Sequence, residues 1–378
     1  MTIPVIAGAH TVPFVKQSDD MVALGTGAVH GLLASTGIDR GAVDAVVSAS
    51  GNGGTLLGQR ILTRLSMTGI PVFNVENACA SGASAAHLAI SMVRSGQARV
   101  VVVVATERLS AFGGGSLRLD PTDIEAAQGN IMPASYAMRA TRYLWENGLK
   151  PRDIAGVSVK NRANGALNPI ARFQSEVTLD EVLESKPIAD PLTLLQCSPN
   201  SDGSSAVLVC TEDAARELNL DSIKVRASVI TSGLFSDGPR DLTLPDVTLR
   251  AIKEAYAQAD IGPGDVDLAE VHDAFSIAEV LYYETLGFCE RGQGARFLAD
   301  GRAHIGGDVA VNPSGGLIAR GHPVGATGVA QLGEAYEQLT GRAGKRQVPD
   351  ASVAVTHVTG GGISGVDNGA CGVHVLTV

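Results

Sequence analysis

The sequence predicts an α/β fold assembled from two homologous halves, and two internal similarities support this duplication. Residues 79–86 match residues 322–329: each segment places a reactive type of residue, two spacers, Gly, Ala and then Ser or Thr before a helix of small residues. Residues 38–44 and 261–267 are also alike, and both lead into an apolar stretch that is typical of a strand. Each half is therefore expected to repeat one order of helices and strands.

In the first half, helices and strands alternate as they do around a mostly parallel sheet. We expect a helix near residues 21–36, strands at residues 45–48 and 71–75, a helix from Cys79 to about residue 95, and a strand after residue 97. The β-branched run Val100–Val104 is typical of a buried central strand.

An insertion is expected to interrupt the first half. From residue 113 to about residue 197 the pattern changes, with helices predicted near Ala134–Glu146 and Arg152–Arg162. The segment after Ser201 returns to a strand pattern of small residues, which would complete the first half. We therefore expect an N-terminal half at residues 1–112 plus about 198–222, an inserted loop domain at 113–197, and a C-terminal half at 223–378.

Composition excludes several classes of protein. With 378 residues and 45% hydrophobic content, the chain can bury a large core. Its 29 basic and 39 acidic residues give a net charge of −10, which argues against binding to nucleic acid or to anionic membranes. No segment approaches the ~18 apolar residues of a membrane span. The five cysteines lack paired metal spacing, so they predict reduced thiols in a cytoplasmic protein and neither disulfides nor a metal site.

Cys79 is the candidate nucleophile, because it follows a predicted strand and begins a predicted helix. The free N–H groups and the dipole at a helix start favour a thiolate, so we expect its pKa to fall below the usual value of about 8.5. The same N–H groups can hold an oxyanion. A buried structural cysteine is the alternative interpretation.

His322 occupies in the second half the position that Cys79 occupies in the first. If a pseudo-twofold axis relates the halves, the two helix starts meet and the thiol lies beside the imidazole. A thiol beside an imidazole is the usual arrangement for activating a sulfur nucleophile.

A basic segment stands out inside the predicted insertion. Residues 139–172 hold seven basic and two acidic side chains, a net charge of +5 in a chain of net −10. This segment predicts a landing site for a phosphorylated substrate, and a solvated helical face is the alternative. The basic residues are Arg139, Arg142, Lys150, Arg152, Lys160, Arg162 and Arg172.

Several motifs, in order along the whole chain, together resemble the thiolase superfamily. They are Asn77–Gly82, His272–Phe275, Asn312–Gly316, Gly321–Gly328 and Gly360–Gly362. The His-Asp-x-Phe element, with Lys160–Arg162 and Ser201–Gly203, is similar to the branch of the sterol-carrier-protein-x and archaeal-type thiolases.

This resemblance implies a five-layer αβαβα fold and acyl transfer with coenzyme A or acyl-CoA as substrate and no permanently bound cofactor. Cys79 would carry the acyl group, His322 would act as its base, and His272 would orient a water or donate to an oxyanion. The N–H groups of Cys79 and Gly360 would form a second oxyanion hole. The coenzyme would contact Arg139, Arg142, Lys160, Arg162, Arg172 and Ser314.

The chain departs from the family pattern in one respect. Thiolases that make or cleave carbon–carbon bonds usually carry a second cysteine, but the corresponding positions here are Ala274 and Val358. Cys289 and His357 are the first candidates to replace it, although Cys289 is also compatible with a core position at a helix end.

Three functions are compatible with the resemblance. The first is an acyltransferase that thiolyses 3-oxoacyl-CoA or condenses two acyl groups in lipid metabolism. The second is a retro-aldol lyase that works with an OB-fold/zinc-ribbon partner, and the third is a non-catalytic subunit that binds acyl-CoA. The intact set of Cys79, His272 and His322 favours the first function. Relatives often form homodimers.

Overall fold

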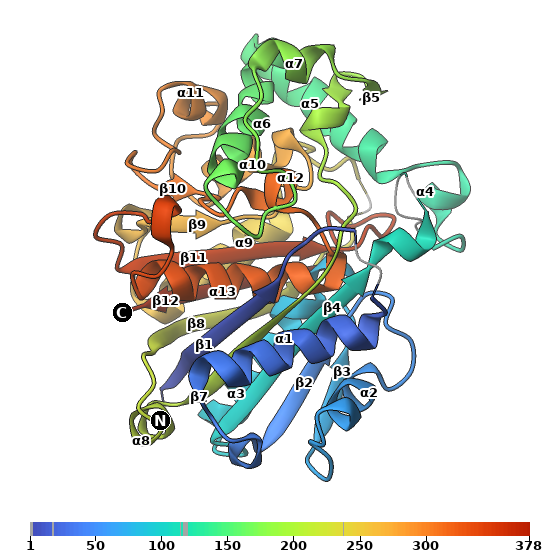
Figure 1. The fold of residues 1–378 in the computed structure, drawn as a ribbon. Helices are drawn as coiled ribbons and strands as arrows, with labels where there is room; N and C mark the ends of the chain where they lie inside the picture. Colours follow the sequence, from blue (N-terminus) through green and yellow to red (C-terminus); the bar gives the residue numbers. More distant parts are fainter. Residues whose placement is uncertain (1–2, 17–18, 114, 116–119, 237) are drawn as a thin grey trace.

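The computed structural model describes residues 3–16, 19–113, 115, 120–236 and 238–378. Ten strands are hydrogen-bonded in the order β10-β9-β11-β12-β8-β1-β7-β4-β2-β3 (Figure 1). The strands of the first half are β1 (Pro4–Val12), β2 (Ala45–Ala49), β3 (Val72–Val75), β4 (Val100–Arg108) and β7 (Asp202–Thr211). Those of the second half are β8 (Ile223–Ser232), β9 (Leu268–Glu270), β10 (Ala310–Val311), β11 (Val353–Gly360) and β12 (Ala370–Thr377).

The two halves repeat one strand order and one set of strand directions. In the first half β1–β7 and β7–β4 pair antiparallel, whereas β4–β2 and β2–β3 pair parallel. In the second half β8–β12 and β12–β11 pair antiparallel, whereas β11–β9 and β9–β10 pair parallel. A short antiparallel contact between β1 and β8 joins the halves. The predicted duplication is thus confirmed.

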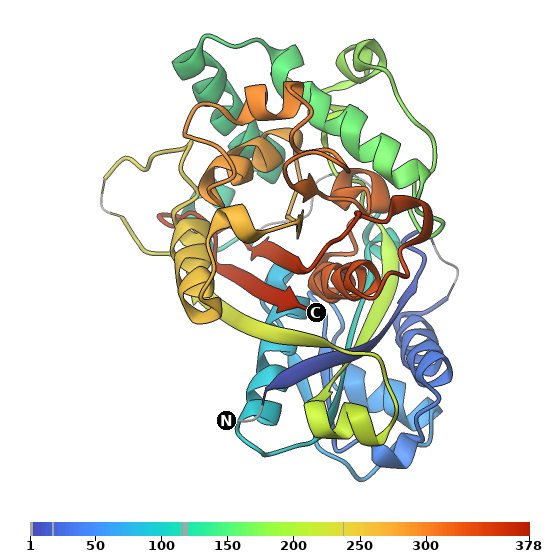
Figure 2. The same cartoon turned by 90° about the vertical axis from the view of Figure 1, so that its left-hand side faces the viewer.

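Five layers follow from the placement of the main helices. Helices α3 (Ser81–Arg94) and α13 (Thr327–Leu339) contact each other and strands of both halves, so they form the central layer. Helices α1 (Met21–Thr36) and α2 (Leu57–Arg64) cover the outer face of the first half, and α9 (Asp246–Ala259) covers that of the second. Accordingly, α1 and α9 lie on opposite sides of the molecule (Figure 2). The predicted αβαβα fold is confirmed.

The run of valines in β4 fits a strand that is covered on both faces. Val101 and Val103 belong to the central core between the two sets of strands, and Val102 and Val104 belong to the core beneath α1 and α2. Because successive side chains of a strand point to opposite faces, a strand covered on both faces must be apolar at every position. The continuous β-branched run therefore reflects two buried faces.

Glycines explain how the central helices approach each other so closely. A Cβ on Gly82 would lie 2.8 Å from the Gly325 oxygen, and a Cβ on Gly328 would lie 2.5 Å from the Ala83 nitrogen. Gly82 is thus required by helix packing. Its counterpart in the repeated pattern, Gly325, lies instead against the end of β2, where a Cβ would be 2.7 Å from the Cα of Ser50.

Between β4 and β7 the chain leaves the sheet and forms helices α4 (Ile124–Ala127), α5 (Met132–Asn147), α6 (Pro151–Ala166) and α7 (Leu179–Glu184), and strands β5 (Pro187–Ala189) and β6 (Leu192–Thr193). Helices α5 and α6 coincide with the two helices predicted there. Helix α6 packs on α10 (Ser276–Thr285), α11 (Gly294–Ala299) and α12 (Gly316–Arg320) of the second half (Figure 1). Helix α8 (Glu212–Glu217) follows β7. None of the described helices combines the length and apolar character needed to cross a bilayer.

Candidate active site

Cys79 lies in a tight turn between β3 and α3. The turn Ala78–Ala80 is 3₁₀-helical, and α3 begins two residues after Cys79, at Ser81. The Ser81 hydroxyl fixes the turn, because it accepts from the N–H of Asn77 at 2.9 Å and donates to the carbonyl of Ala78 at 2.6 Å. Cys79 is buried there, with 8% of its surface exposed.

His322 lies in the corresponding place before α13. It precedes the 3₁₀ turn Val324–Ala326, and its Nδ1 is 2.8 Å from the hydroxyl of Thr327, the first residue of α13. The Thr327 hydroxyl also donates to the Pro323 carbonyl at 3.3 Å, so it can accept the Nδ1–H of His322. That tautomer leaves an unprotonated Nε2, the form a general base requires.

His272 follows β9, and its Nδ1 is 2.9 Å from the hydroxyl of Thr359 near the end of β11. The Tyr282 hydroxyl lies 3.5 Å from the same threonine oxygen. The other ring nitrogen, Nε2, is buried and has no hydrogen-bond partner among the described residues. Both the β9 and β11 ends are carboxyl ends of parallel strands, where ligand sites of α/β sheets gather.

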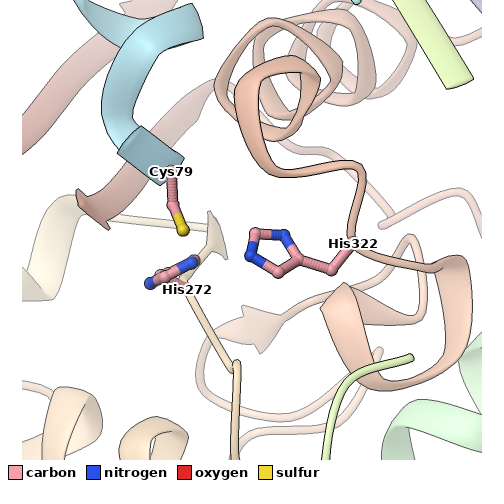
Figure 3. A group of neighbouring side chains, drawn as sticks. All are labelled: Cys79, His272 and His322. Carbon is pink, nitrogen blue, oxygen red and sulfur yellow. The ribbon is translucent and has the colours of Figure 1, made fainter. Parts of the chain in front are cut away.

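The three side chains meet at one point. One ligand atom from each of Cys79, His272 and His322 lies within 4.8 Å of the others. The two imidazole centroids are 5.2 Å apart with an interplanar angle of 65°. Figure 3 shows the sulfur directed toward the space between the two rings. The fold thus brings Cys79 and His322 together, as the duplication predicts, and adds His272.

Burial governs the ionisation of all three groups. Desolvation, with a smaller contribution from the charge of Glu107, raises the pKa of the Cys79 thiol to about 12. The backbone N–H groups of Gly361 and of Cys79 itself only partly offset this rise in pKa. Burial lowers the pKa of His272 to about 3 and that of His322 well below its usual value. The expectation of a lowered thiol pKa was wrong, because burial outweighs the helix start.

A cavity of about 570 Å³ opens over this cluster. Tyr136 and Phe275 stack at 4.5 Å between ring centroids and form part of its wall. The apolar lining also includes Met132, Pro133, Ile188 and Leu194, and the polar lining includes Lys16, Arg172, Asn200 and Asn368. Such a mixed cavity can bury an acyl chain beside the sulfur and still present polar groups to a charged carrier.

Comparison with known proteins identifies the family. The model of the thiolase N-terminal domain matches residues 4–213, and the model of the thiolase C-terminal domain-like family matches residues 234–367. The chain belongs to the thiolase family.

Two relatives share 41% identity with this thiolase. The benzoylsuccinyl-CoA thiolase subunit BbsB of Thauera aromatica aligns over 94% of both chains. The acetyl-CoA acetyltransferase of Methanothermobacter thermautotrophicus aligns over 96% of this chain and 95% of its own. Human sterol carrier protein 2 is 36% identical over 94% of this chain and 69% of its own length. This thiolase is an acyltransferase.

Two solved structures share the fold. The Ltp2-ChsH2(DUF35) aldolase superposes with a TM-score of 0.85 and 25% identity over 99% of this chain and 98% of the other. Human mitochondrial 3-ketoacyl-CoA thiolase superposes with a TM-score of 0.74 and 17% identity over 100% of this chain and 98% of the other, which supports the fold alone.

The structure contradicts part of the predicted coenzyme site of this thiolase. Lys160 is 2% exposed, and its Nζ lies 2.9 Å from Glu279 Oε1 and also bonds Asn161. Ser314 is fully buried, and its hydroxyl donates to Glu270 at 2.7 Å. The polar atoms of both side chains bind internal partners, so the prediction that Lys160 and Ser314 contact the coenzyme was wrong.

The four arginines of that prediction differ in placement. Arg139 forms a largely buried ion pair with Asp367, and Arg162 donates to Ser175 beneath the ring of Phe173. Arg142 is exposed and pairs with Glu146. Of these four, Arg172 alone lines the cavity, where its Nη1 donates to the carbonyl of Asn200 at 3.0 Å.

Gly360 and Gly361 contact the Cys79 turn in different ways. A Cβ on Gly360 would lie 2.2 Å from the Asn77 oxygen, so this glycine lets β11 touch the Cys79 turn. Gly361 lines the cavity and directs its N–H toward the sulfur. Sequence reasoning assigned no role to Gly361, Thr327 or Thr359. The partners of Gly361 and Thr359 come from other segments, whereas Thr327 contacts His322 within one motif.

The four positions discussed for a second proton carrier differ in their distance from the cavity. Ala274 lines the cavity, whereas Val358 is buried against the Cys79 turn. Neither Cys289 nor His357 is among the cavity residues: Cys289 packs at the end of the second-half core, and His357 Nε2 is 2.9 Å from the Thr248 hydroxyl. Cys197 does line the cavity, with its sulfur 3.4 Å from the Thr193 carbonyl.

Proposed function

We propose that the protein transfers acyl groups between thioesters of coenzyme A through an acyl-Cys79 intermediate. The reaction is thiolysis of a 3-oxoacyl-CoA or its reverse, a Claisen-type condensation. The observation that carries the proposal is the buried cluster in which the Cys79 sulfur lies between two imidazoles held by Thr327 and Thr359. A neutral thiol and a neutral base, buried side by side, are the reactants that such a step needs.

In the first step the Cys79 sulfur attacks the 3-oxo carbonyl, and His322 Nε2 accepts the thiol proton. The raised thiol pKa means that this proton leaves only as the carbon–sulfur bond forms, so the general base is required. The carbon–carbon bond then breaks, the electron pair leaves on the acetyl-CoA enolate, and the proton taken from the thiol returns to that carbon. The thiol of a second coenzyme A then attacks the acyl-Cys79 carbonyl, its proton passes to the departing Cys79 sulfur, and the new acyl-CoA leaves.

His272 stabilises the negative charge that develops on the substrate oxygen. If Nδ1 accepts from the Thr359 hydroxyl, the unpartnered Nε2 carries the proton and donates to the oxyanion. Because the pKa of His272 is low, the donor is a neutral imidazole. The N–H groups of Cys79 and Gly361 serve the oxyanion of the acyl-cysteine thioester.

Glu107 positions the His322 turn. Its carboxyl group accepts from the N–H of Gly51 at 2.8 Å and from the N–H of Gly325 at 3.1 Å. It thereby links the end of β2 to the turn that follows His322.

The coenzyme enters past the cationic side chains of the cavity. Lys16 is exposed and Arg172 is partly buried, and both line this space. They are the groups available to meet the anionic carrier while the acyl chain lies along Tyr136 and Phe275. A homodimer is the assembly we expect from the family resemblance.

A second candidate function is favoured by one comparison. The structural similarity to the Ltp2-ChsH2(DUF35) aldolase supports retro-aldol cleavage with a DUF35-type partner. Aldol cleavage forms no acyl-cysteine, so intact-protein mass spectrometry separates the two. After incubation with a panel of acyl-CoAs, the acyltransferase gains the mass of one acyl group per chain. An unchanged mass, with cleavage of a 3-hydroxyacyl-CoA upon adding a DUF35 protein, would favour the lyase.

A further inference from the structure

The catalytic cluster also has the composition of a divalent-metal site. Cysteine and histidine are the ligands that Zn²⁺ prefers, at about 2.0 to 2.3 Å from the ion. Tetrahedral coordination at those lengths separates ligand atoms by roughly 3.3 to 3.8 Å. The ligand atoms of Cys79, His272 and His322 already lie within 4.8 Å of one another. Small side-chain rotations would close the remaining gap.

The surroundings of the two imidazoles resemble those of histidines bound to metals. A metal-bound histidine usually engages its second ring nitrogen with an oxygen, which fixes the ring and its tautomer. Here Thr327 holds Nδ1 of His322 at 2.8 Å, and Thr359 holds Nδ1 of His272 at 2.9 Å. Nε2 of His322 is unprotonated in the tautomer described above. In His272 the ring proton must move from Nε2 to Nδ1, which then donates to Thr359, and Nε2 becomes available as a ligand.

A second observation points to a missing ligand. His272 is 4% exposed, yet no residue in the described part of the chain forms a hydrogen bond with its Nε2. Buried polar atoms are rarely left without one, because the lost hydrogen bond is costly.

We propose that Cys79 Sγ, His272 Nε2 and His322 Nε2 bind one Zn²⁺ ion per chain, with the fourth position open to the cavity. The Cys79 S–H bond is replaced by an S–Zn bond, the proton leaves to solvent, and no atom changes its oxidation state. Metal and acyl group then compete for the same sulfur, so Zn²⁺ is a reversible, active-site inhibitor.

Cobalt provides the direct test, because Co²⁺ takes the same ligands and has a visible spectrum. The reduced, chelator-treated protein is titrated with Co²⁺ and then with Zn²⁺. We expect one ion per chain, the ligand-field bands of a four-coordinate ion and a thiolate-to-cobalt charge-transfer band that Zn²⁺ displaces. Cys79→Ser should lose the charge-transfer band, and His272→Gln or His322→Gln should weaken binding by at least about tenfold.

Two substitutions control for binding elsewhere. Cys197→Ser alters the other cavity thiol considered above, and His30→Gln alters an exposed histidine; both should bind as the unaltered protein does. Circular dichroism melting identifies any variant that fails to fold. A charge-transfer band that persists in folded Cys79→Ser, or no stoichiometric binding by the unaltered protein, would overturn the proposal.

A chemical experiment gives an answer that does not depend on enzyme activity. Zn²⁺ should slow alkylation of Cys79 by iodoacetamide, and a chelator should restore the rate. Alkylation that proceeds equally fast with and without Zn²⁺ would also refute the site. Since neither measurement uses an acyl substrate, failure here is distinguishable from failure of the acyl-transfer function.

Discussion

The Asp273 carboxylate accepts the backbone N–H of Leu317 at 2.6 Å and so ties the His272 loop to helix α12. The same carboxylate accepts from the N–H of Ile318 at 3.2 Å. Helix α12 ends at Arg320, two residues before His322. Asp273, which follows His272, thus fixes the position of helix α12, which leads to His322.

Asp273→Asn should therefore disturb the catalytic geometry. The amide group brings a donor against the N–H groups that the carboxylate accepts, so the two histidines lose their common anchor. We expect acylation of Cys79 to slow by about tenfold while the KM for acyl-CoA stays within a factor of about two. Single-turnover acylation measures this effect, and an unchanged acylation rate would show that Asp273 has no positioning role.

His322→Ala and His272→Ala should impair different steps. Loss of the base that takes the thiol proton should slow acylation by about 10²-fold or more. Loss of His272 should instead slow the carbon–carbon step by about 10²-fold, since it meets the charge of the enolate oxygen. Rapid-quench measurement of both steps distinguishes the variants. Equal acylation defects would contradict this division of roles.

Acid should destabilise the protein through its buried histidines. The pKa of folded His272 is about 3, so between pH 6.5 and 3 the unfolded state binds a proton that the folded state does not. Stability from this group is thus present above pH 6.5 and falls as the pH falls, by up to about 1.4 kcal/mol per pH unit. Urea unfolding between pH 4 and 7 should show a shallower slope for His272→Gln than for the exposed control His30→Gln. Equal slopes would mean that His272 is protonated in the folded state.

Lys160 and Arg172 should separate stability from coenzyme binding. Lys160→Met leaves Glu279 buried without its cation, which should cost about 3 to 5 kcal/mol of unfolding free energy.

Arg172→Glu should instead raise the KM for acyl-CoA and leave the KM for acyl-thioesters without the nucleotide unchanged. Arg142→Glu, on an exposed helix face, is the matched control. If Arg142→Glu raised the KM as much as Arg172→Glu, the coenzyme would not pass Arg172.

Much of the fold could be predicted because its signals are local. The repeated segments at Cys79 and His322 reflect two helix starts that meet in the central layer, and Val100–Val104 reflects a strand buried on both faces. His272 was found through the resemblance of its motif, since no local pattern connects it to Cys79.

The errors share one physical cause, which is burial by distant segments. The basic count around Lys160 could not reveal that Glu279 neutralises it inside the core. The helix start at Cys79 suggested a low thiol pKa, but β11 and the His322 turn enclose the sulfur and desolvate it.

The acyl group itself provides the most direct test of the account. The protein is mixed with acyl-CoA and quenched in acid, and its peptides are mapped by mass spectrometry. We expect the acyl group on Cys79 alone, a folded but unlabelled Cys79→Ser variant, and full labelling of Cys197→Ser. An acyl group on Cys197, Cys210, Cys289 or Cys371, or turnover by Cys79→Ser, would contradict the central claim.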